Sequence, residues 1–255
     1  MSVVADTLSG MAVDIGEMLD RLLTEGAHRF DDAHDCRMTM IPLGEVTVPT
    51  GRIVACDPLI HPGETPPFTV TAPPGRYPLR AWVAVVHPAG SMLAAGPPAT
   101  APGPATTRPA GNDAGGAGRL AGLPIEADRR TAALQLVVRD EPVATWEPAV
   151  PAGPGPSILD EDGFATYPAD SGTGALADER ALAGLRTWSY ARVEQTYLPE
   201  PGPPAPSALD AVTDPATGAN VVAVATGDGD GGYATFIGRT ASGKVATFVT
   251  DFRVI

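Results

Sequence analysis

Five aspartates at the ends of expected strands or in turns are the side chains best placed to do chemistry in this sequence. They are Asp57, Asp170, Asp228, Asp230 and Asp251. A rigid sheet presents such positions to ligands, and converging carboxylates could hold a hard cation or supply an acid and a base. Alternatively, each carboxylate accepts hydrogen bonds from the amides of its own turn. We expect Asp170 and at least one of Asp228 and Asp230 to face one pocket.

The acidic, glycine-rich bend from Gly227 to Gly232 resembles two known binding loops, but its spacing fits neither. Asp228 and Asp230 match the first ligands of a calcium loop, yet Tyr233 replaces the required glycine and Arg239 the final glutamate. Successive glycine amides could form a nest for phosphate, but the two carboxylates oppose an anion and no GK[ST] sequence follows. The pattern therefore favours a sharp turn that opens the next strand.

Nucleophilic, zinc-dependent and cofactor chemistry find no support in the sequence. The chain has no GxSxG motif and no convincing Cys and His pair. His28, His34 and Cys36 lie close together, but their spacing fits no zinc finger or ribbon. We therefore expect no metal centre and no cofactor, and enzyme activity is left open.

Composition excludes several classes of partner. The chain has 255 residues, with 30 acidic against 17 basic side chains and a net charge of −13, which repels nucleic acid and anionic membranes. No segment approaches the roughly 20 apolar residues of a membrane span. Acidic residues interrupt the N-terminus, which argues against a secretory signal, and two cysteines are too few for a disulfide framework. We expect a soluble, cytoplasmic protein.

The elements that must position the aspartates are mostly strands. Apolar residues recur at helical spacing within residues 1–26 and predict an N-terminal helix, which either covers a sheet or binds a partner. Short β-branched runs separated by Pro and Gly predict antiparallel strands, including two strands within 38–48 and a long central strand at 76–86. Residues 88–124 are rich in Pro, Gly and Ala and predict a flexible insertion. Leu176 to Tyr197 is expected to begin as a helix.

The C-terminal part from 220 to 255 predicts a three-strand β-meander. Its strands are expected at Asn220–Ala225, Tyr233–Ile237 and Lys244–Ile255, with the acidic bend joining the first two. The whole chain, 1–255, is expected to be a single domain.

Several fragments together resemble the bacterial domain-of-unknown-function family 4241 (DUF4241). They include PTGRIVACDPL from Pro49, PGRYPL from Pro74 and TYPADSGTG from Thr166, followed by GDGDGGY from Gly227 and TDF from Thr250. The resemblance extends from about Glu45 to Ile255, apart from the low-complexity insertion. It names a family without implying a reaction, and no catalytic role is carried over from it.

Taken together, the sequence predicts a β-rich α+β protein built on an antiparallel sheet or a two-sheet sandwich with an N-terminal helix. Its favoured function is a non-enzymatic binding or protein-interaction module for a protein or a small polar ligand. The alternatives are a hydrolase-like or carbohydrate-active enzyme with Asp170, Asp228 and Asp230 as candidate catalytic groups, and a divalent-cation-binding protein. The candidate binding residues are Asp57, Arg76, Tyr233, Arg239 and Asp251, of which the two arginines either bind a ligand or pair with motif aspartates.

Overall fold

The computed structural model describes residues 14–29, 34–60, 62–88 and 128–255. The expected flexible insertion at 88–124 lies outside these ranges except for Pro88. Residues 1–13 of the expected N-terminal helix also lie outside them.

Two antiparallel sheets form the body of the described chain, which confirms the expected β-rich fold. The large sheet has the order β1-β2-β4-β5-β13-β12-β8-β7, with β6 paired to β12. Its strands are β1 (Gly26–Arg29), β2 (His34–Val48), β4 (Gly75–Pro88), β5 (Asp128–Val137), β6 (Thr145–Pro148), β7 (Ile158–Leu159), β8 (Ala165–Ala169), β12 (Gly231–Arg239) and β13 (Val245–Asp251). The small sheet has the order β10-β11-β9-β3, with β3 (Ile53–Cys56), β9 (Thr173–Asp178), β10 (Leu209–Asp214) and β11 (Ala219–Ala225).

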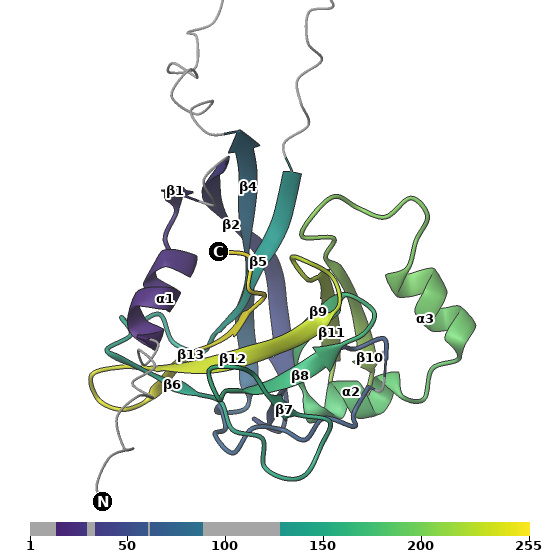
Figure 1. Cartoon of the computed structure of the whole chain (residues 1–255). Helices are drawn as coiled ribbons and strands as arrows, with labels where there is room; N and C mark the ends of the chain where they lie inside the picture. The colour runs from purple at the N-terminus through teal and green to yellow at the C-terminus, as the bar shows by residue number, and fades with distance from the viewer. Residues whose placement is uncertain (1–13, 30–33, 61, 89–127) are drawn as a thin grey trace, which may run out of the picture.

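Three apolar cores separate four layers (Figure 1). The central core lies between the two sheets and includes Val48, Leu79, Leu176, Val224 and Phe248. Helix α1 (Ile15–Leu22) packs on the outer face of the large sheet, whereas α2 (Glu179–Leu185) and α3 (Tyr190–Tyr197) lie at the small sheet. The order of layers is therefore helix, sheet, sheet and helices.

The N-terminal helix acts as a cover for the large sheet. Asp14 is its N-cap, and the Asp14 side chain accepts a hydrogen bond from the Glu17 backbone N–H at 3.2 Å. Leu19 and Leu22, four and seven residues after Ile15, are fully buried. The described part of the apolar stripe thus packs within the chain, as the first of the two interpretations expected.

The two strands expected within residues 38–48 are one continuous strand. β2 pairs with β4 from His34↔Pro88 to Val48↔Gly75, and the register shifts between Pro42 and Glu45. A bulge absorbs Pro42 and Gly44 without ending the strand, because a bulge tolerates a proline that cannot donate to the ladder.

The expected C-terminal meander is divided between the two sheets. β11 pairs with β9 and β10 in the small sheet, whereas β12 and β13 pair with each other in the large one. The bend from Gly227 to Gly232 is therefore a crossing from one sheet to the other and not a hairpin turn. The helix expected from Leu176 also begins later, at Glu179, because residues 173–178 form β9.

Candidate functional site

Asp57 is a buried structural carboxylate. Its Oδ1 accepts hydrogen bonds from the backbone N–H groups of Leu59 and Ile60 and from the hydroxyls of Ser171 and Thr173, at 2.7 to 3.2 Å. Its Oδ2 accepts one from the Ser171 backbone N–H at 2.7 Å. A carboxylate offers about four lone-pair sites, so these five hydrogen bonds within the protein occupy most of the acceptor capacity of Asp57. It fastens the end of β3 to the turn between β8 and β9.

The structure brings the turn that carries Asp170 next to the acidic bend. β8 and β12 pair through Ala169↔Gly231, and a Cβ added at Gly172 would lie only 3.3 Å from the Cα of Gly229. Asp170 is exposed. The close approach of these two turns is the feature on which the paired-aspartate hypothesis depends.

The aspartates of the bend are exposed beside Asp170 but do not line a described cavity. Asp228 forms an ion pair with Arg130 at 2.8 Å, and Asp230 is exposed. None of Asp170, Asp228 and Asp230 lines any of the three cavities described for this chain, including the two discussed below. Their convergence on one pocket stays a prediction.

The Tyr233 side chain stabilises the acidic bend from Gly227 to Gly232. Its hydroxyl donates to the Gly229 carbonyl at 2.7 Å, and the Thr226 hydroxyl donates to the same oxygen. The Tyr233 ring is buried edge-on against Phe252 and Tyr167, and burial raises the pKa of the Tyr233 phenol. In the structure this candidate binding residue is a support for the bend.

Both candidate arginines pair with glutamates and not with motif aspartates. Arg76 contacts Glu45 at 3.1 Å on the surface. Arg239 donates from Nε and Nη2 to one oxygen of Glu147, at 2.9 and 2.6 Å, and from Nη1 to the Gly243 carbonyl. The glutamates lie on adjacent strands, where cross-strand pairing brings opposite charges together.

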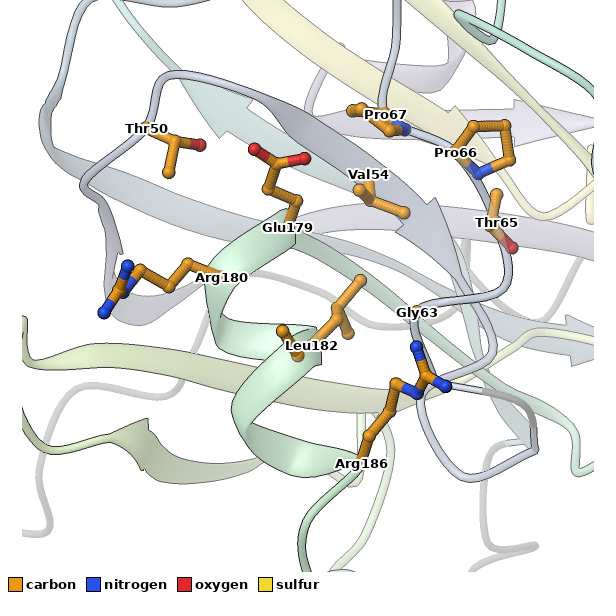
Figure 2. Close-up of a pocket in the computed structure, with 11 residues that line it drawn as sticks. Thr50, Val54, Gly63, Thr65, Pro66, Pro67, Glu179, Arg180, Leu182 and Arg186 are labelled. Atoms are coloured by element: carbon orange, nitrogen blue, oxygen red, sulfur yellow. The ribbon is translucent and has the colours of Figure 1, made fainter.

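The largest of the described cavities lies against α2 and is called here the α2 pocket (Figure 2). Its volume is about 400 Å³, which falls within the range of small-molecule sites. It is lined by Thr50, Val54, Gly63, Thr65, Pro66, Pro67, Glu179, Arg180, Leu182, Ala183 and Arg186. Apolar and proline side chains thus form its walls, and three charged side chains stand around them.

Local hydrogen bonding fixes α2 against the start of β3. Asp178 caps the helix by accepting from the Arg180 backbone N–H at 2.9 Å. The other oxygen of Asp178 accepts from the backbone N–H and the hydroxyl of Thr50, at 3.0 and 2.8 Å. Because Asp178 is fully buried, its carboxylate needs these partners, and the pocket wall is held rigidly by them.

Of the three charged groups at the α2 pocket, one is uncompensated. Glu179 pairs with Arg52 at 3.2 Å, and Arg180 pairs with Asp214 at 2.6 Å. The Arg186 guanidinium makes no hydrogen bond or ion pair within the described ranges. Figure 2 shows it beside Gly63, where a Cβ added to this glycine would lie 2.8 Å from the Arg186 Cδ. The pocket therefore offers a free cation next to apolar walls.

Asp251 lies apart from this pocket. It ends β13 and lines a second cavity with Met18 and Phe236, which belong to the core under α1. Burial raises the pKa of its carboxyl to about 6, although the backbone N–H and the charge of Arg253 act in the opposite direction.

Sequence reasoning missed the residues of the α2 pocket as a site. Arg186 lies in no quoted motif, and the opposite wall of its pocket, from Thr50 to Pro67, lies more than a hundred residues away in the chain. The one available signal was the PTGR fragment at Pro49, which contains Thr50. Within the described ranges, no group of three or more His, Cys, Asp and Glu side chains is disposed to hold a metal.

Comparison with known families agrees with the fragments quoted above. The family described as "Protein of unknown function (DUF4241)" matches residues 46–96 and 119–250, more than half of the chain. The chain belongs to this family. The DUF4241 match includes the β3 and α2 segments that form the α2 pocket and ends one residue before Asp251. Searches of curated proteins and of solved structures gave no match. In the described part of this DUF4241 member, no helix is long and apolar enough to cross a membrane.

Proposed function

We propose that this DUF4241 protein is a non-enzymatic binding module whose α2 pocket takes a ligand that carries a carboxylate on an apolar body. The observation that carries the proposal is the Arg186 guanidinium, which stands at the pocket without a partner in the described ranges. A planar guanidinium matches a carboxylate in geometry and can donate two parallel hydrogen bonds to it.

The walls of the pocket suit the rest of such a ligand. Val54 and Leu182 are buried at its floor, and the rings of Pro66 and Pro67 lose little conformational freedom when they pack against a ligand. The neighbouring ion pairs of Glu179 and Arg180 leave little net charge besides that of Arg186. These features favour a small organic acid or the acidic side chain of a partner protein.

The proposed setting is the bacterial cytoplasm. Cys36 and Cys56 are both free and buried, which suits a compartment that keeps thiols reduced. The two alternatives from the sequence gain less support. Asp57 accepts five hydrogen bonds within the protein, and Asp228 is paired with Arg130, which leaves few carboxylates for catalysis or for a divalent cation.

The test compares 4-methylpentanoate with 4-methylpentanamide, its neutral isostere, by titration calorimetry on the full chain. We expect the acid to bind roughly tenfold or more tightly than the amide, because a hydrogen bond to a charged group contributes about 1.5–3 kcal/mol. Arg186→Gln should remove this preference. The matched control is Arg76→Gln, an exposed arginine outside the pocket, which should leave binding unchanged.

Two results would overturn the proposal. One is equal affinity for the acid and the amide in the wild-type protein. The other is unchanged acid binding in Arg186→Gln. A screen of short peptides with and without a terminal Glu, read in the same way, separates a partner protein's side chain from a free acid.

A further inference from the structure

A second cavity, called here the α1 cavity, combines apolar walls with uncompensated negative charge. It has a volume of about 230 Å³ and lies between α1 and the end of β13. Its apolar lining includes Met18, Phe164 and Phe236, and its acidic lining consists of Asp160, Asp162 and Asp251. The rings of Phe164 and Phe236 meet edge to face, with centroids 5.2 Å apart.

Asp251 is the residue of the α1 cavity that indicates a ligand-binding site. Its side chain is only 8% exposed. Oδ1 accepts a hydrogen bond from the Arg253 backbone N–H at 2.7 Å, but Oδ2 accepts none from any residue in the described ranges. Asp251 lines the cavity, so Oδ2 keeps acceptor capacity for a ligand bound there. A ligand that supplies a positive donor would satisfy it.

The basic side chain that lines the α1 cavity forms no ion pair with this carboxylate. Arg253 also lines the α1 cavity, but its guanidinium pairs with Glu161 at 2.9 Å and forms no ion pair with Asp251. Asp160 uses Oδ1 to accept from the backbone N–H groups of Asp162 and Phe164. Three carboxylates thus face one guanidinium that already has a carboxylate partner of its own.

We propose that the α1 cavity binds a primary alkylammonium group, with the ammonium at Asp251 Oδ2 and the aliphatic chain lying against the contacting rings of Phe164 and Phe236. An ammonium is a compact donor that needs one free oxygen, whereas a guanidinium prefers two, and Oδ1 of Asp251 is already occupied. The aromatic rings add apolar contact and attract a cation at their faces.

The volume and the lining of the α1 cavity restrict the class of possible ligands further. Sites for drug-sized molecules begin at about 300 Å³, so this smaller space suits a short chain. Metal binding is disfavoured because the three carboxylates are not disposed as a metal-binding group among the described residues. A free short-chain amine and a lysine side chain present the same chemistry to the cavity.

The test is calorimetry on the full chain at pH 7.5 with n-pentylamine and with n-pentanol, which has the same shape without the charge. The amine should bind about tenfold or more tightly than the alcohol. Asp251→Asn should abolish that preference, since Asn keeps an oxygen for the Arg253 N–H but carries no charge. Asp230→Asn, at an exposed aspartate outside the cavity, is the matched control. Nα-acetyl-lysine N-methylamide in place of the amine distinguishes a lysine side chain from a free amine.

A second readout does not depend on the variant's folding. In the wild-type protein, saturation with n-pentylamine should lower the pKa of the Asp251 carboxyl measured by NMR, because a bound cation stabilises the ionised form. Asp160, Asp162 and Arg253 are the other charged groups that face Asp251 and remain constant in this comparison. Equal binding of the amine and the alcohol, or an unchanged pKa of Asp251 at saturation, would overturn the proposal. Neither result bears on the α2 pocket, which lacks these residues.

Discussion

Asp57 and Ser171, which lie 114 residues apart in the chain, are joined by two hydrogen bonds of 2.7 Å, one to each carboxylate oxygen. Ser171 donates its backbone N–H to Oδ2 and its hydroxyl to Oδ1. This contact fixes the turn after β8 against the end of β3, and thereby the large sheet against the small one.

Asp57→Ala should therefore destabilise the fold strongly. The change leaves the part-buried hydrogen bonds from Ser171 and Thr173 without their acceptor, and a hydrogen bond to a charged group contributes about 1.5–3 kcal/mol. We expect the free energy of unfolding in urea to fall by roughly 2–4 kcal/mol. Asp170→Ala, one residue before Ser171 and exposed, should change it by less than about 0.5 kcal/mol. Equal effects of the two substitutions would contradict a structural role for Asp57.

Comparing Gly51→Ala with Gly243→Ala should separate the energetic cost of a steric clash from the cost of backbone strain. Gly51 has a φ of +79°, and a Cβ there would lie 2.2 Å from the Ala72 carbonyl oxygen. Gly243 has a φ of +77° with nothing within 4 Å of an added Cβ. Gly243→Ala should cost about 1 kcal/mol from strain alone, and Gly51→Ala distinctly more. Thermal and urea unfolding measure the loss of unfolding free energy in the two variants. Equal losses would show that the segment containing Ala72 moves away from the added Cβ without cost.

Asp251 should make stability depend on pH in an unusual direction. Burial raises the pKa of its carboxyl from the ordinary value of 3.8 to about 6, so the folded state binds more protons than the unfolded state between these values. The stabilising contribution is full below about pH 4 and is lost as the pH rises to about 6, by up to about 3 kcal/mol.

The measurement is the difference in unfolding free energy between wild type and Asp251→Asn at pH 4 and at pH 7. Because the neutral amide does not titrate, the variant should gain relative to wild type as the pH rises. A difference that stays constant across this range would show that Asp251 has an ordinary pKa in the folded protein.

Tyr233→Phe should loosen the acidic bend with little effect on the core. It removes the hydroxyl that donates to Gly229 at 2.7 Å and keeps the ring against Phe252. The expected loss is about 0.5–1.5 kcal/mol, with faster amide hydrogen exchange confined to the bend. Tyr190→Phe, at a ring that is 74% exposed, is the control and should alter neither quantity.

Local patterns in the sequence predicted element types better than element partners. The strand at 76–86 corresponds to β4 because its two apolar faces are a local property. β11 was also placed correctly, but its neighbour was not, because pairing Val224 with Gly174 joins residues fifty positions apart in the chain. Nothing in residues 220–225 alone states which sheet they enter.

The same difference between local sequence pattern and long-range contact explains which features of the candidate sites could be predicted. The motif aspartates were visible as residues, but whether a carboxylate is engaged in hydrogen bonds within the protein, as Asp57 is, depends on donors from a distant turn. Arg186 is an ordinary helix-end arginine in the sequence, and only the fold brings the loop at Gly63 against it. Sequence spacing could predict a turn, but not the charge balance of a pocket made of separate segments.

The alternation of strands between the two sheets has a consequence for synthesis on the ribosome. β3 emerges early but finds its partner only in β9, where Ile53 pairs with Asp178. β13, after every other strand in chain order, lies in the interior of the large sheet between β5 and β12. A nascent chain therefore exposes open strand edges until β13 has been translated, and such non-local pairing is slow and prone to aggregation. Protection by a chaperone during translation would act on those edges.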